Sequence, residues 1–186
     1  RGILDHRYFR PEFLDLLGRI RDRVPAAGAR SNVIVRFPGE TEGELAELEG
    51  FLVEARLDVV GVFGYSDEEG THAATLPDKV DPDEVADREG RLSRLVEQLL
   101  SQRADDRVGS VVDVLVDRVV AGDEADLPGA IPDAEGRADH QAPEVDGVTV
   151  LRGCAIEPGS VVRARVVAAE GIDLVAEPIV DSGVSA

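Results

Sequence analysis

Two short apolar runs on either side of one amphipathic helix constrain the fold of this 186-residue chain most strongly. Residues 31–37 and 57–63 are rich in β-branched side chains and favour strands, and the second run shows little polar alternation. Between them Thr41 begins a segment in which leucines recur at helical spacing. A strand, a helix and a second strand form a βαβ unit, so we expect parallel strands, the second buried on both faces.

Two further helical segments flank this βαβ unit. Residues 11–24 carry apolar side chains at helical spacing, with Pro11 suited to the first turn and Pro25 expected to end the helix. A third helix is expected over residues 83–104. Its apolar stripe consists of Leu92, Leu95, Val96, Leu99 and Leu100. We therefore assign residues 1–102 to an α/β domain.

The pattern changes after residue 102 to short strands separated by turns with Gly, Pro and Asp. We expect strands over residues 111–116, 148–152, 161–167 and 172–176, and an acidic loop over residues 122–135. Short strands with such turns are typical of a small β-barrel, which we place at residues 103–179. The predicted fold class is α/β plus all-β.

Charge also divides the chain, whose formal net charge is −18 at pH 7. Residues 1–30 carry seven arginines against four acids, whereas residues 107–186 carry six arginines against fifteen acids, a net charge of −9. Small β-barrels that bind RNA use a basic face, because Lys and Arg bind the phosphates. An acidic all-β domain would therefore suit a basic protein partner better than nucleic acid, and a merely soluble acidic surface stays open as the alternative.

The residues that usually carry catalytic or metal chemistry are sparse. Cys154 is the single cysteine, so it forms neither an intrachain disulfide nor a cysteine-based metal site, and we expect it to be buried beside a strand. His6, His72 and His140 show no ligand spacing, so we predict no catalytic residue and no metal ligand. No apolar run reaches the roughly 20 residues of a membrane span, and no signal peptide is visible, so we expect a cytoplasmic protein without membrane contact.

The segment 37–44 has both a local explanation and a candidate function. Thr41, with a glutamate three residues later, forms a capping box for the helix that follows. In α/β folds, however, ligands bind beyond the carboxyl ends of parallel strands, which is where this segment is expected. Gly39 would let a ligand approach the backbone closely, and Tyr65 with Ser66 follows the next strand at the equivalent rim.

Several segments of the chain together resemble one enzyme family. They are residues 30–41 (RSNVIVRFPGET), 60–71 (VGVFGYSDEEGT), 102–103 (QR), 136–137 (GR) with 142–147 (APEVDG), and 173–174 (DL). This set is similar to the C-terminal part of the radical SAM methylthiotransferases, over about residues 11–178. The GR and APEVDG segments resemble the branch that modifies an aspartate of the twelfth small-subunit ribosomal protein.

The resemblance implies a three-part enzyme that adds a methylthio group to the β-carbon of that aspartate. The intact family uses S-adenosylmethionine and two 4Fe-4S clusters, one in an N-terminal domain and one in a central barrel. It further implies that residues 1–102 are part of a radical SAM (βα) barrel and that residues 103–179 are an OB-like TRAM domain. The implied cofactor-binding residues are Arg30, Gly39, Glu40, Tyr65 and Ser66, and the implied contacts to the substrate protein are Arg137, Glu144 and Asp146.

Two features depart from the family pattern. The cysteines that hold the clusters are absent, so we expect this chain alone to hold no cluster or S-adenosylmethionine and to be inactive. Because these cysteines are missing, we expect a fragment, a truncated gene product or a degenerate relative, and the start at Arg1 without Met is in keeping with a fragment. Arg36 stands where the family pattern has glycine, and we predict that it hinders binding of S-adenosylmethionine.

Two other interpretations stay open at this point. The chain can be a stand-alone acidic TRAM-like module that binds a basic protein or RNA, in which case a start codon lies near Arg1. It can also be a fragment of an unrelated α/β enzyme with an OB-like tail that binds RNA. The gene sequence upstream of Arg1 and salt-dependent RNA binding distinguish these interpretations from the first.

Overall fold

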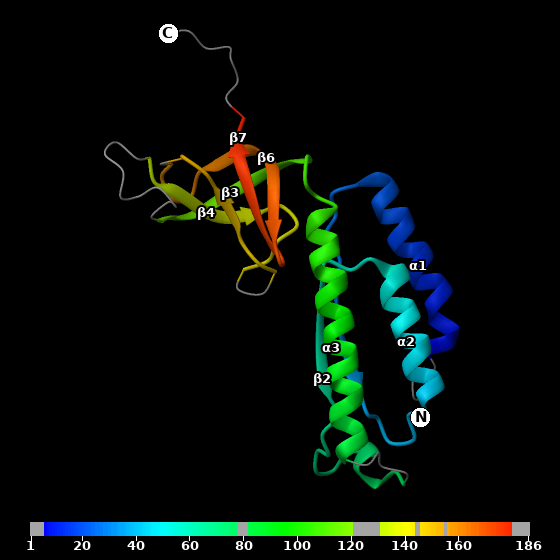
Figure 1. Ribbon diagram of the computed structural model, residues 1–186. Coiled ribbons are helices and arrows are strands. Elements are labelled where there is room, and N and C mark those ends of the chain that lie inside the picture. Colours follow the sequence, from blue (N-terminus) through cyan, green and yellow to red (C-terminus); the bar gives the residue numbers. More distant parts are fainter. Residues whose placement is uncertain (1–5, 78–81, 121–130, 144–145, 155, 180–186) are drawn as a thin grey trace, which may run out of the picture. The chain divides into compact units, whose positions relative to one another are not determined.

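The computed structural model describes residues 6–77, 82–120, 131–143, 146–154 and 156–179, with the backbone alone described for residues 6–9 and 82–85 (Figure 1). The chain forms two compact units. The α/β unit comprises Arg1–Pro25 and Ala29–Leu100, and the barrel unit comprises Ala26–Gly28 and Ser101–Ala186.

The α/β unit contains the expected helix–strand–helix–strand order followed by a long helix (Figure 1). Its elements are α1 (His6–Arg23), β1 (Arg30–Val35), α2 (Glu42–Ala55), β2 (Val59–Gly64), a 3₁₀ turn η1 (Ala73–Thr75) and α3 (Pro82–Asp105), whose last turn extends beyond the unit. β1 and β2 pair in parallel, from Arg30 opposite Val59 to Val35 opposite Gly64. The predicted βαβ unit and third helix are therefore confirmed.

One face of this two-stranded sheet shares a hydrophobic core with α1, α2 and α3. The core consists of Leu17, Val35, Leu45, Leu52, Ala55, Leu57, Leu92 and Val96, with Val33, Val60 and Val62 packed against it. The other face carries Ile34 and Phe63, which are register partners and are 61 % and 55 % exposed. The prediction that residues 57–63 are buried on both faces is therefore wrong, because the described helices cover a single face.

The start of α1 also differs from the prediction. The helix begins at His6, so Pro11 lies inside the helix instead of in its first turn. Proline has no amide hydrogen, so the helix gives up one backbone hydrogen bond at this position.

The barrel unit is a closed five-stranded barrel, as expected for the all-β part. Its strands are β3 (Val111–Val120), β4 (Asp133–Ala138), β5 (Thr149–Leu151), β6 (Val161–Glu170) and β7 (Asp173–Pro178), arranged in the order β3-β4-β5-β7-β6. Inward and outward side chains alternate along β3 and β6, as a barrel with one buried face requires. The core includes Val112, Val114, Val116, Leu151, Val162, Ala164, Val166 and Leu174.

Strand β4 was not predicted, and the expected loop over residues 122–135 is wrong at its end. Asp133 to Glu135 belong to β4, whereas residues 121–130 lie outside the described residues. The sequence of β4, DAEGRA, lacks the β-branched side chains that mark a strand because its inward positions must be small. Ala134 is fully buried, and a Cβ added to Gly136 would overlap the carbonyl oxygen of Leu115.

Cys154 is buried in the barrel core, as expected. Burial raises the pKa of its thiol, and the nearby carboxylate of Asp133 raises it further. A thiol in these surroundings is inert, because the thiolate is the reactive form. No helix in the described part of the chain is both long and apolar enough to cross a membrane.

Candidate functional site

The carboxyl ends of β1 and β2 bring two loops of the α/β unit together. The first loop, residues 36–41, connects β1 to α2, and the second begins at Tyr65. The rings of Phe37 and Tyr65 meet edge to face with their centroids 5.4 Å apart, and the Tyr65 amide donates to the carbonyl of Val35 over 2.8 Å. We call this region the carboxyl edge. It is where ligands bind in α/β sheets generally.

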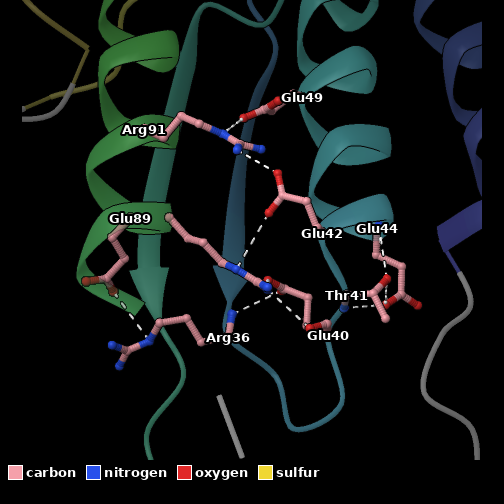
Figure 2. Close-up of polar contacts among 9 residues, drawn as sticks. Arg36, Glu40, Thr41, Glu42, Glu44, Glu49, Glu89 and Arg91 are labelled. Atoms are coloured by element: carbon pink, nitrogen blue, oxygen red, sulfur yellow. Dashed lines mark hydrogen bonds and ion pairs between the residues drawn. The ribbon is translucent and has the colours of Figure 1, made fainter. Parts of the chain in front are cut away.

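The loop 36–41 is a tight turn closed by a helix cap. The amide of Glu40 donates to the carbonyl of Phe37 over 2.9 Å, and Gly39 has a φ of +85°, which glycine adopts without strain. The Oγ1 of Thr41 accepts from the Glu44 amide, and the Glu44 carboxylate accepts from the Thr41 amide, which confirms the capping box (Figure 2). Open space surrounds the position where a Cβ on Gly39 would lie.

Arg36 occupies the end of β1 in a conformation that favours glycine. Its φ is +74°, one of two positive values at non-glycine residues in the described part of the chain. Its Nη2 donates to the carbonyl of Tyr65 over 3.3 Å, and its Nε lies 3.8 Å from the carboxylate of Glu89 in α3 (Figure 2). The guanidinium of Arg36 therefore bridges the ends of both strands and α3.

A network of charged side chains fastens α3 to the loop and to α2. Arg88 lies 3.3 Å from a carboxylate oxygen of Glu40, and Arg91 lies 2.6 Å from Glu42 and 2.6 Å from Glu49. Figure 2 shows Arg91 reaching from α3 to the two glutamates of α2. This network was not predicted. Arg88 lies one turn before Leu92, on the same side of α3 as the apolar stripe. A charged residue at a position expected to be buried is the sequence signal that could have revealed this network.

Four of the five predicted cofactor-binding residues gather at the carboxyl edge. Gly39 and Glu40 lie in the first loop, while Tyr65 and Ser66 donate their hydroxyl protons to Asp67 and Glu68 in the second. Partial burial raises the pKa of Tyr65, and the hydrogen bond to Asp67 adds to this effect.

The fifth predicted cofactor-binding residue, Arg30, lies at the other edge of the sheet. It begins β1, five residues before Val35 ends that strand. At about 3.3 Å per residue, this places it roughly 17 Å from the carboxyl edge. The structure therefore does not bring Arg30 together with the other four residues.

Arg137, a predicted contact to the substrate protein, lies on the outside of the barrel in an ion pair. Its guanidinium donates to both carboxylate oxygens of Asp117 over 2.8 and 2.9 Å, across β4 and β3. The neighbouring Arg118 pairs with Glu135 through one nitrogen, Nη2, which lies 2.9 and 2.7 Å from the two carboxylate oxygens. The hydrogen bond from Arg137 holds the pKa of Asp117 below its usual range.

The second predicted contact, Asp146, is buried and holds a turn between β4 and β5. Its Oδ2 accepts from the Ala142 amide over 2.7 Å, and the adjacent Gly147 has a φ of +76°. In the same turn the Oε1 of Gln141 accepts from the Ala138 amide and from the hydroxyl of buried Thr149. These contacts give the APEVDG segment a structural role. The third predicted contact, Glu144, lies outside the described residues.

The side chains of this chain do not fit an iron–sulfur cluster. Such a cluster is held by several thiolates, whereas the sequence has one cysteine, buried in the barrel core. No three His, Cys, Asp or Glu side chains among the described residues could hold a metal ion together. At the carboxyl edge, open space surrounds the position of a Cβ on Gly39, and the Tyr65 carbonyl accepts from Arg36.

Comparisons with known proteins connect both units to one kind of enzyme. A family model described as the TRAM domain matches residues 108–179. The chain is 57 % identical over 171 residues to the ribosomal protein uS12 methylthiotransferase RimO of Streptomyces coelicolor, which covers 91 % of this chain and 34 % of that protein. The proteins of the same name from Nocardioides sp. and Saccharopolyspora erythraea are 56 % and 51 % identical, over 93 % and 90 % of this chain and 35 % and 33 % of their own length.

The chain thus spans about a third of the length of the curated relatives that it matches. The matched third is their C-terminal part. The resemblance deduced from the sequence segments is therefore confirmed, including the branch to which the GR and APEVDG segments pointed.

Proposed function

We propose that this chain is the C-terminal part of a methylthiotransferase that modifies an aspartate of ribosomal protein uS12. The observation that carries the proposal is an identity above 50 % that extends over both units, including the carboxyl edge and the barrel. The chain alone is inactive under this proposal, because the residues that hold the two clusters are not among its 186 residues.

In the proposed enzyme the α/β unit is one segment of a larger radical SAM (βα) barrel. The exposed pair of Ile34 and Phe63 supports this assignment, because an apolar sheet face is usually covered by further protein. Both strands of the described sheet are also edge strands, which further strands would pair. The proposed boundary between this segment and the TRAM domain lies near residue 102.

The carboxyl edge is the proposed binding region for S-adenosylmethionine. When bound in such an enzyme, this cofactor supplies the radical that removes a hydrogen atom from the unactivated β-carbon. The loop 36–41 and the rim at Tyr65 and Ser66 would bind and orient its nucleoside part. Arg36 opposes this role, since its guanidinium occupies the Tyr65 carbonyl at the same edge.

The proposed partner of the barrel unit is the basic ribosomal protein named in its relatives, in the cytoplasm. The net charge of −9 over residues 107–186 supports a basic partner and disfavours RNA, whose phosphates this surface would repel. Asp113 on β3 and Glu177 on β7 are exposed on the outside of the barrel and contribute to this charge.

Fluorescence anisotropy with labelled uS12 and the 186-residue chain tests the partner. We expect saturable binding that weakens with salt, and a loss of at least about tenfold when Asp113 and Glu177 are both changed to Lys. Glu47 and Glu97, exposed in the α/β unit, provide a control variant with the same change of charge and little effect. Binding of an RNA oligonucleotide at about 150 mM salt, with none of uS12, would contradict the proposal and favour the RNA-binding interpretation.

A further inference from the structure

Arg88 places a positive charge inside the α/β unit. It is 7 % exposed and lies in α3 one turn before the fully buried Leu92. A buried guanidinium is costly unless its charge and its hydrogen-bond donors are matched by partners. The partners of Arg88 therefore indicate what this position in α3 accomplishes.

The main partner of Arg88 is Glu40, in the middle of the loop at the carboxyl edge. One nitrogen, Nη1, lies 3.1 Å from the backbone carbonyl of Glu40 and 3.3 Å from its Oε1. The other carboxylate oxygen of Glu40, Oε2, accepts from the backbone amide of Arg36 over 3.0 Å (Figure 2). Both carboxylate oxygens of Glu40 are thus engaged within the protein, and its side chain is 13 % exposed.

We propose that Arg88 is a positioning residue, which holds the loop 36–41 through Glu40. Arg88 neutralises the Glu40 carboxylate and keeps it inside the unit, where it accepts from the Arg36 amide at the other end of the loop. Glu40 consequently fixes the loop instead of contacting the ligand, which leaves the open side at Gly39 to face it. The functional meaning of this arrangement rests on the proposed role of the carboxyl edge in cofactor binding.

Arg91 provides a matched control in the same helix. It lies three residues after Arg88 and pairs with Glu42 and Glu49 of α2, outside the loop. The two arginines share Glu42, which lies 3.8 Å from the Arg88 Nε, but Arg88 alone is paired with Glu40. Removing either arginine deletes the same charge from α3. Arg88 differs because Glu40, once it has lost its counter-charge, is expected to turn its carboxylate towards water and release the Arg36 amide.

Amide hydrogen exchange by NMR on the 186-residue chain, without any ligand, tests the proposal. Arg88→Met keeps an apolar stem of similar length, and we expect it to lower the protection of the Arg36 amide at least tenfold relative to Arg91→Met. The amide of Asp58, which donates to Ala29 at the opposite edge of the sheet, reports on global stability and should change equally in both variants. Arg88→Lys should restore most of the protection, because a single ammonium can meet both Glu40 oxygens that Nη1 contacts.

Two results would overturn the proposal. One is an Arg36 amide that loses no more protection than that of Asp58 in Arg88→Met, which would make Arg88 merely structural. The other is a folded Arg88→Lys variant in which the Arg36 amide is unprotected. This second test can be made even if Arg88→Met does not fold. The hydrogen-exchange experiment contains no ligand, so its result does not depend on the proposed cofactor role of the carboxyl edge. The uS12 binding experiment in turn does not depend on the positioning role of Arg88.

Discussion

Replacing Arg36 by Gly should stabilise the α/β unit relative to Arg36→Ala, although both changes remove the same side-chain contacts. With its φ of +74°, position 36 is left-handed. That conformation costs an L-residue about 1–2 kcal/mol because Cβ crowds the backbone, whereas glycine escapes this cost. Glycine at the same time lowers the free energy of unfolding by about 0.4–1 kcal/mol, because it gives the unfolded chain more conformational freedom. We therefore expect Arg36→Gly to be more stable than Arg36→Ala by about 1 kcal/mol.

The contacts that both variants lose are weak. The guanidinium of Arg36 donates over 3.3 Å to the Tyr65 carbonyl and lies 3.8 Å from Glu89, whose side chain is 36 % exposed. An ion pair of this kind contributes about 0–1 kcal/mol. Arg36→Gly should thus lie close to the unchanged protein in stability, with Arg36→Ala below both.

Urea unfolding followed by tyrosine fluorescence measures this difference within the α/β unit. The chain has two tyrosines and no tryptophan, and both tyrosines lie within the first 65 residues, so the signal reports on this unit. Tyr65 also packs against Phe37 in the loop itself. If Arg36→Ala proved as stable as Arg36→Gly, the backbone at position 36 would not be strained and the reasoning would be refuted. In a longer enzyme that holds its clusters, Arg36→Gly is also predicted to bind S-adenosylmethionine more tightly.

Two further predictions concern the barrel unit. Gly136→Ala should destabilise it by about 1–3 kcal/mol, because a Cβ would overlap the Leu115 carbonyl, and a thermal melt followed by circular dichroism checks this. Gly18→Ala, with no atom within 4 Å of the new Cβ, is the control and should not destabilise α1. Asp117→Asn should lower the stability at pH 7, because Arg137 holds the pKa of Asp117 below its unfolded value of 3.8. The loss should be less than about 1 kcal/mol, because the ion pair is partly exposed to solvent. This contribution to the free energy of unfolding is present above pH 3.8 and is lost as the pH falls through the lower folded pKa. Urea unfolding at several pH values should therefore show the stabilities of Asp117→Asn and the unchanged protein converging in acid. A difference in stability that stays constant with pH would contradict this prediction.

Local features of the chain were predictable because neighbouring residues decide them. The Thr41 capping box depends on two residues three positions apart, and the alternation along β3 and β6 depends on side-chain order alone. The turn at Gly39 likewise needs only a glycine next to a proline. Such local signals predicted the βαβ order, the third helix, the barrel and the position of the loop at the carboxyl edge.

Tertiary structure decided the features whose cause lies far away in the sequence. Strand β4 carries no strand signal of its own, because the backbone of Leu115 leaves room only for glycine at position 136. The roles of Glu40 and Arg88 depend on a contact across 48 residues, and that of Asp146 on its burial in a turn of the barrel. Arg36 combines both levels: its departure from the glycine that the resemblance implies is a prediction from the sequence, whereas its left-handed backbone and its hydrogen bond to the Tyr65 carbonyl became visible only in the fold.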